Sequence, residues 1–177
     1  MRLFVAVWPD RPTLERLASL PLGTTEGLRL VGPGTWHVTL RFLGDVDDDR
    51  VPELVEALDT IPADLPGALR CRLGPHTAWF GDRVLQIPAR GLEDLAAAVR
   101  SATAPVVPVR SDPEPRFNGH LTVGRATGHR LDTRARRSRA GIPFAANFGV
   151  DSFDLVASEP SRPGRRYTTL ARFWLRG

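Results

Sequence analysis

Apolar and polar positions follow two periods along this chain. Short runs in which every second residue is apolar, rich in β-branched and aromatic residues, predict strands. Apolar residues three and four positions apart predict helices. The predicted strands are 2–8, 28–30, 35–43, 68–73, 77–80, 83–87, 117–123, 144–148, 152–159 and 167–175. Helices are predicted from Asp10 to about Leu20, from Val51 to Leu58 and from Leu92 to Ala102.

The order of these elements predicts two similar α+β halves and not the alternating strands and helices of a parallel sheet. With 177 residues, 42% of them hydrophobic, the chain can bury a core as one domain or as two fused lobes. No stretch approaches the roughly 20 apolar residues of a membrane span. The apolar run Leu3–Val7 is shorter than the roughly 7–15 residues of a secretion signal, so a cytoplasmic location is expected.

Composition and charge narrow the function only a little. The net charge is +4, and all 24 basic residues are arginine. A GC-rich genome would produce this bias, but the planar guanidinium also suits phosphate, so an RNA partner is permitted.

The single cysteine, Cys71, excludes an internal disulfide and is expected to be a small strand residue. The acidic run Asp45–Asp49 suits the start of a helix better than a metal site. Five arginines between Arg130 and Arg139 fit a solvated segment or an RNA contact.

One four-residue pattern occurs twice. His37-Val38-Thr39-Leu40 and His120-Leu121-Thr122-Val123 both read His-apolar-Thr-apolar, each within a predicted strand. Because alternate side chains share a face of a strand, histidine and threonine point together while the apolar residues enter the core. Two such strands would place two imidazoles and two hydroxyls in one groove.

This combination suits the opening of a cyclic phosphodiester. A base must take a proton from water, and an acid must protonate the departing ribose oxygen. Histidine titrates near pH 6.5, so one imidazole can be neutral while the other is charged. Thr39 and Thr122 can donate hydrogen bonds to phosphate oxygens, and no metal is needed. His76 and His129 each lie beside a loop and are expected to be structural. No third histidine or carboxylate has a spacing that completes a metal site.

Around these motifs the sequence resembles the RNA 2',3'-cyclic phosphodiesterase family (LigT-like) of the two-histidine phosphoesterase superfamily. The resemblance is in residues Arg2–Val7, Trp36–Gly44, His120–Arg125 and Gly164–Tyr167, followed by Leu170 and Phe173. The order and spacing of these segments match over almost the whole chain.

The resemblance implies an α+β fold in which two antiparallel β-sheets, flanked by helices, form a bilobal pseudo-twofold arrangement around a central cleft. Residues 1–177 would form a single two-lobed phosphodiesterase domain. The implied reaction is hydrolysis of a 2',3'-cyclic phosphate at an RNA 3' end to a 2'-phosphate, with reverse 2',5' ligation as a further activity. RNA ends such as those of tRNA fragments are the implied partners, with no cofactor, no metal, no membrane and no obligate protein partner. His37 would be the general acid and His120 the general base.

Three further residues are expected at the substrate. Arg125 matches a family arginine that helps to bind phosphate, but strict alternation places it on the face opposite His120. Its strand must therefore end, twist or bulge near Gly124. Arg41 shares the face of His37 by alternation and is expected to contact the substrate backbone, and Tyr167 is expected to reach the cleft. Trp36 and Phe42 have the opposite parity, which favours burial in the core.

Two other functions remain open on the sequence. The same site could serve another small substrate, such as a 2',5'-oligonucleotide or a cyclic phosphate of ADP-ribose. A non-catalytic, arginine-rich RNA-binding module would show salt-sensitive binding without turnover. The paired motif argues against the module, because binding alone does not need two placed imidazoles.

Overall fold

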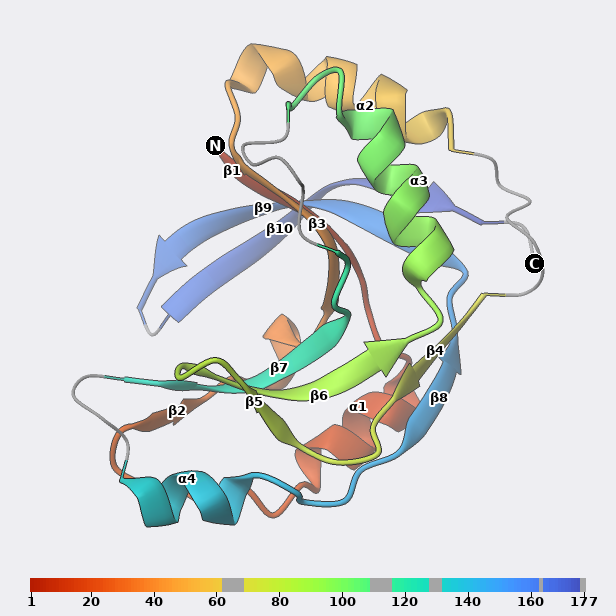
Figure 1. Ribbon diagram of the computed structural model, residues 1–177. Coiled ribbons are helices and arrows are strands. Elements are labelled where there is room, and N and C mark those ends of the chain that lie inside the picture. Colours follow the sequence, from red (N-terminus) through yellow and green to blue (C-terminus); the bar gives the residue numbers. More distant parts are fainter. Residues whose placement is uncertain (62–68, 109–115, 128–131, 163, 176–177) are drawn as a thin grey trace.

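Ten antiparallel strands form a curled sheet in the computed structural model, which describes residues 1–61, 69–108, 116–127, 132–162 and 164–175 (Figure 1). The strands are β1 (Arg2–Val7), β2 (Leu28–Leu30), β3 (Val38–Asp45), β4 (Arg70–Leu73), β5 (Ala78–Phe80), β6 (Val84–Arg90), β7 (His120–Ala126), β8 (Ala146–Gly149), β9 (Ser152–Ser161) and β10 (Gly164–Trp174). Their order is β10-β9-β1-β3-β7-β6-β4-β8, while β2 pairs with β7 and β5 pairs with β6.

The sheet consists of two four-stranded halves that meet at a narrow seam. The first half is β10-β9-β1-β3 and the second is β7-β6-β4-β8. Across the seam, β3 and β7 are joined through one residue pair, Val38 with Leu121. In both halves, each strand runs antiparallel to its neighbours from the seam outward. This matching arrangement confirms the predicted α+β, bilobal, pseudo-twofold fold.

Four helices accompany the two halves in the described part of the chain. They are α1 (Arg11–Ala18), α2 (Val51–Asp59), α3 (Glu93–Thr103) and α4 (Thr133–Arg139). The helix α3 follows β6 of the second half but packs against β3 and α2 at the first half, whereas α1 follows β1 and contacts β8 (Figure 1). These two helices therefore cross the seam in opposite directions and fasten the halves together. Asp10 caps α1 by accepting from the Thr13 amide, as the sequence predicts.

The strand β1 has a different environment on each face. Leu3, Val5 and Val7 belong to the main core, while Phe4 and Ala6 belong to a small cluster on the opposite face. Trp36 and Cys71 are buried as expected, and burial raises the pKa of the Cys71 thiol to about 12. The face of β1 away from the main core is therefore available to line a site.

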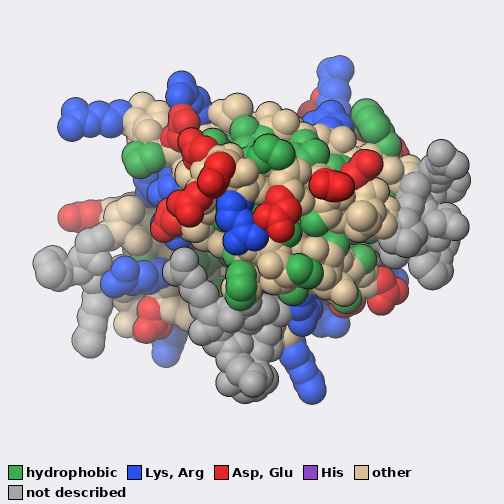
Figure 2. All heavy atoms as spheres, turned by 90° about the horizontal axis from the view of Figure 1, so that it is seen from above, with side chains coloured by type: hydrophobic (Ala, Val, Ile, Leu, Met, Phe, Trp, Pro, Cys, Tyr) green, Lys and Arg blue, Asp and Glu red, His purple; other side chains and the backbone are tan. Residues whose placement is uncertain are grey.

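Acidic side chains gather over α2 and α3. Figure 2 views this side of the molecule from above, and no histidine side chain is seen on it. Glu53, Glu93 and Asp94 lie in the first turns of the two helices, where the helix dipole favours negative charge. The acidic run lies directly before the first turn of α2. The described residues contain no cluster of three or more potential metal ligands. No helix in the described part of the chain is long and apolar enough to cross a membrane.

Truncation of a core leucine in α3 should destabilise the fold. Leu95 is fully buried, so Leu95→Ala should lower the free energy of unfolding by about 2–5 kcal/mol through lost burial and a residual cavity. Leu170→Ala is the matched control, because Leu170 is 38% exposed, and it should cost less than about 1 kcal/mol. Urea denaturation of both variants measures the difference, and equal losses would contradict this account of the core.

Candidate active site

A cleft of about 1110 Å³ lies between the two halves of the sheet. Residues of β1, β2, β3, β7, β9 and β10 contribute to its walls. All seven residues predicted at the site line it: His37, Thr39, Arg41, His120, Thr122, Arg125 and Tyr167. The two motifs, 83 positions apart in the sequence (120 − 37), thus contribute to one cavity.

The two imidazoles are held in the same way. His37 Nδ1 lies 2.7 Å from the carbonyl oxygen of Thr35, and His120 Nδ1 lies 2.9 Å from that of Asn118. A carbonyl oxygen only accepts, so Nδ1 carries the hydrogen in both rings. Nε2 is then the atom that can take or give a proton at each site.

His37 is packed among three aromatic rings. Its ring centroid is 4.9 Å from that of Phe4, 5.3 Å from that of Trp8 and 5.2 Å from that of Tyr167. The Tyr167 ring meets the imidazole edge-on at 90°. Tyr167 therefore reaches the cleft, as expected, and does so as a direct neighbour of the first histidine.

This packing changes the acidity of His37. Burial lowers its pKa to about 4, since removal of water disfavours the imidazolium form. The hydrogen bond to Thr35 opposes this shift, while Arg125 and His120 add to it by electrostatic repulsion. Without a bound anion, His37 is therefore neutral at pH 7.

His120 has a more open environment. Its ring stacks on Phe80, with centroids 5.3 Å apart and an interplanar angle of 13°, and Phe80 is itself 47% exposed. The two histidines thus share one backbone arrangement but not one environment.

A bulge in β7 turns Arg125 into the cleft. Consecutive residues of β6 pair with Gly124 and Thr122, so Val123 is an extra residue in β7. Gly124 then lies against Leu28, and Arg125 faces the cavity with Thr122. The expected break near Gly124 is present, and binding of phosphate by Arg125 stays a prediction.

A second bulge, in β3, changes what alternation predicts for Arg41. Consecutive residues of β1 pair with Arg41 and Thr39, so Leu40 is the extra residue. Arg41 borders the cleft, but its guanidinium donates to Thr103 Oγ1 at 2.5 Å and to the Val107 carbonyl at 2.8 Å. The expectation that Arg41 shares the face of His37 is therefore wrong, and its contact with substrate stays a prediction.

The same bulge brings Phe42 to the cleft. Phe42 is 60% exposed, stacks on Phe4 with centroids 5.9 Å apart, and lies beneath the guanidinium of Arg2 at 5.7 Å. The prediction that Phe42 is buried in the core is wrong, because it assumed unbroken alternation. The sequence holds no glycine at the bulge itself that could have signalled it.

The cleft is strongly basic. Among the described residues that line it, none is acidic and seven are arginines: Arg2, Arg29, Arg41, Arg100, Arg116, Arg125 and Arg165. Arg165 donates to Ser158 Oγ at 2.6 Å, which fixes it on the β9–β10 hairpin. Arg29 of the opposite half lies against Gly164 of that hairpin, where a Cβ atom would come within 2.7 Å of its guanidinium. Positive charge therefore faces the histidines from both halves.

The arginines of α4 are outside this cleft. Arg136 lies over the Trp79 ring at 4.7 Å and donates to the carbonyls of Gly81 and Asp82, so it fastens α4 to the β5–β6 turn. Arg134 and Arg137 are exposed, in keeping with a solvated helix.

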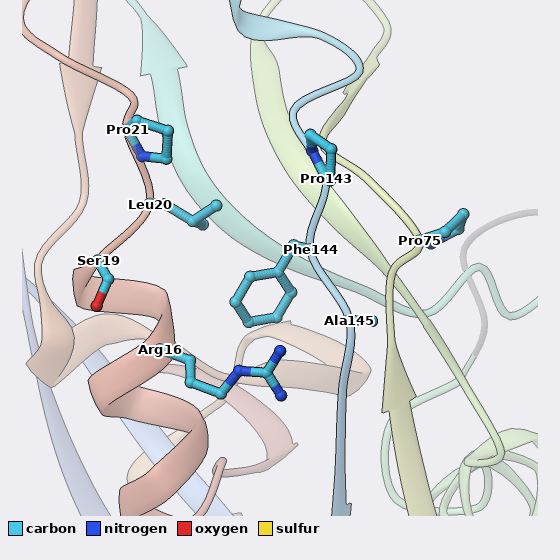
Figure 3. Close-up of a pocket in the computed structure, with 8 residues that line it drawn as sticks. All are labelled: Arg16, Ser19, Leu20, Pro21, Pro75, Pro143, Phe144 and Ala145. Carbon is cyan, nitrogen blue, oxygen red and sulfur yellow. The ribbon is translucent and has the colours of Figure 1, made fainter.

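His76 and a second hollow are also separate from the site. His76 Nδ1 lies 3.2 Å from the Thr77 carbonyl, away from the cleft, while His129 and Arg130 lie outside the described residues. A hollow of about 400 Å³ lies between α1 and the segment before β8. In Figure 3, Arg16 of α1 and Phe144 point toward each other in this hollow, and its described lining includes no histidine.

The fold and the paired imidazoles define a two-histidine phosphoesterase. Comparison with known proteins agrees: the family described as LigT like Phosphoesterase matches residues 7–68. An RNA 2',3'-cyclic phosphodiesterase of Thermus thermophilus is 30% identical over 192 residues, which cover 100% of this chain and 91% of that protein. One of Archaeoglobus fulgidus is 28% identical over 71% of this chain and 72% of its own.

Solved structures give the same result. The crystal structure of TT0787 of Thermus thermophilus has a TM-score of 0.83 at 28% identity and covers 100% of this chain and 99% of its own. Escherichia coli LigT complexed with 3'-AMP has a TM-score of 0.74 at 28% identity, over 98% and 97% of the two chains. The chain belongs to the LigT-like phosphoesterase family.

The acidity of His37 can be measured directly. In the protein without ligand, nitrogen-15 NMR should show His37 neutral, with its hydrogen on Nδ1, down to about pH 4. Because the unfolded chain takes up this proton near pH 6.5, the unfolded state binds more protons between pH 6.5 and 4. The stability contribution of His37 is then complete above pH 6.5 and declines as the pH falls toward 4. His37→Asn should lack that part of the decline, and a His37 midpoint at 6.5 or above would refute the prediction.

Proposed function

We propose that this protein hydrolyses the 2',3'-cyclic phosphate at an RNA 3' end to a 2'-phosphate by metal-independent acid–base catalysis. The observation that carries the proposal is the pair of imidazoles in one basic cleft, each with Nδ1 bound to a carbonyl and Nε2 left for proton transfer. The names of the two curated relatives support the same substrate. Both lobes act as one catalytic domain, because each contributes one of the two histidines.

The reaction needs one proton transfer at each histidine. Nε2 of His120 takes a proton from water as the water oxygen bonds to phosphorus. The bond from phosphorus to the ribose 3' oxygen breaks, and Nε2 of His37 gives a proton to that oxygen. Thr39, Thr122 and Arg125 donate to the non-bridging oxygens, whose charge grows in the transition state.

The role of His37 as acid requires the substrate. A pKa of about 4 would leave too little imidazolium at neutral pH. A phosphodiester anion beside the ring favours the charged form and raises this pKa. Substrate binding therefore favours protonation of His37, which can then act as the acid, while Arg125 offsets part of the phosphate charge.

The cleft suits RNA over a small neutral ligand. Its arginines supply the charge that a polyanion needs, and the exposed Phe42 can stack on a base. RNA ends such as those of tRNA fragments are the substrates we propose. Reverse 2',5' ligation would use the same two imidazoles with their proton transfers reversed.

Removal of either imidazole tests the proposed chemistry. His37→Ala and His120→Ala should each lower kcat on an RNA with a 2',3'-cyclic phosphate by about 10²–10⁴-fold. His76→Ala is the matched control and should keep full activity, because His76 lies away from the cleft. Excess EDTA should change no rate, and phosphorus NMR should show a 2'-phosphate.

Any other result of these experiments would contradict a specific part of the proposal. Full activity after loss of either cleft histidine would refute the two-histidine mechanism, and a 3'-phosphate product would refute the proposed direction of ring opening. Salt-sensitive RNA binding without turnover in the unaltered protein would instead identify an RNA-binding module. Turnover of only a 2',5'-oligonucleotide or a cyclic phosphate of ADP-ribose would reassign the substrate.

The role of Arg125 is tested by charge and by shape. Arg125→Ala should lower kcat/KM by about 10–100-fold, the value of one charge-assisted hydrogen bond. Arg125→Lys should recover only part of this, since an ammonium cannot donate in parallel pairs. Arg137→Ala on exposed α4 removes the same charge outside the cleft and should change kcat/KM by less than about twofold. An equal effect of the two alanine variants would assign Arg125 to general electrostatics only.

A further inference from the structure

A buried carboxylate lies behind the aromatic rings that surround His37. Asp154 of β9 is 1% exposed and takes no part in the chemistry proposed above. It accepts hydrogen bonds from Trp8 Nε1 at 3.0 Å, Thr169 Oγ1 at 3.1 Å, and Arg172 Nε and Nη2 at 2.8 and 2.9 Å. Because β9 lies between β1 and β10, this one side chain ties the chain after β1 to the edge strand.

Trp8 is the member of this network that touches the site. It directly follows β1 and packs on the cleft-side cluster of Phe4, Ala6 and Val156. Its ring centroid is 5.3 Å from that of His37, and its only indole N–H is held by Asp154. An indole with its N–H fixed and one side packed has little freedom to rotate away from the imidazole.

We propose that Asp154 is a positioning residue that holds Trp8 against His37, and thereby fixes the imidazole and keeps water from its side. The bond from Nδ1 to Thr35 restrains the ring at one atom only. The rings of Trp8, Phe4 and Tyr167 restrain its remaining faces and edge, so that Nε2 keeps one direction. His120 has an exposed phenyl ring beside it instead, so this support belongs to one histidine of the pair.

Other charges near His37 do not account for this role. Arg125 and His120 face it from β7, and the Tyr167 hydroxyl belongs to β10. The charge of Asp154 is balanced by the two-pronged contact with Arg172 and is separated from the imidazole by the indole. Asp154 therefore acts on His37 through the position of Trp8.

The test compares two tryptophans. Trp8→Phe removes the N–H and part of the ring, so the His37 midpoint in NMR should rise by about one pH unit as water gains access. kcat on the cyclic-phosphate RNA should fall about tenfold with KM within about twofold, since a mobile acid affects proton transfer more than binding. Trp174→Phe is the matched control, because Trp174 is 68% exposed and lies outside the cleft. Its ring lies under Arg172 at 5.9 Å, and phenylalanine keeps a ring at this position, so neither value should change.

A conservative change separates position from charge. Asp154→Asn keeps an oxygen that can accept from Trp8 and should leave the His37 midpoint close to that of the unaltered protein. An unchanged midpoint in Trp8→Phe, or a shift in Asp154→Asn as large as in Trp8→Phe, would overturn the proposal. Circular dichroism establishes that each variant is folded, and Trp8→Tyr replaces Trp8→Phe if the latter does not fold.

The expected fall in kcat rests on the proposed function, whereas the expected shift of the His37 midpoint in NMR does not. A shifted midpoint in a protein without phosphodiesterase activity would refute the function and leave the positioning role intact.

Discussion

The pairing of Val38 with Leu121 is the contact on which the geometry of the site depends. It is the point where the two halves of the sheet are joined, and each partner directly follows one of the two histidines. In an antiparallel register, one step from this pair sets His37 opposite Thr122 and Thr39 opposite His120. The local twofold axis of the site therefore passes between two apolar residues of the core. The buried pair therefore holds both imidazoles in the one cleft between the halves.

The surroundings then break this symmetry. The backbone treats the two rings alike, because each donates Nδ1–H to the carbonyl two residues before it. The side chains packed around the two imidazoles differ: three aromatic rings surround His37, whereas His120 has one exposed phenyl ring beside it. A general acid and a general base are chemically the same side chain with different proton affinities. Differences in solvent access are one of the few ways a symmetric fold can assign these roles.

Periodicity predicted the ten strands and three of the four described helices, the exception being α4, but it could not predict where alternation fails. One inserted residue in β3 turns Phe42 into the cleft and Arg41 toward α3, and the sequence around Leu40 carries no signal of it. In β7 the resemblance required Arg125 at the phosphate, and Gly124 marked a place where the strand could yield, so that bulge could be anticipated. The contact of Asp154 with Trp8 joins residues 146 positions apart, and only the strand order of the folded sheet brings them together.

The arginine-only basic composition has more than one physical use in this fold. Arg41, Arg136 and Arg172 bind carbonyls, hydroxyls or a carboxylate of the protein itself, where a planar donor with several N–H groups suits two partners at once. The arginines of the cleft face a cavity whose described lining holds no acidic side chain, while acidic residues gather over α2 and α3. Such a separation draws a polyanion to one side of the molecule. In the proposed mechanism, this separation would let a histidine of low proton affinity serve as the acid: the arginines would bring the phosphate, and the phosphate charge would favour the imidazolium that the aromatic surroundings disfavour.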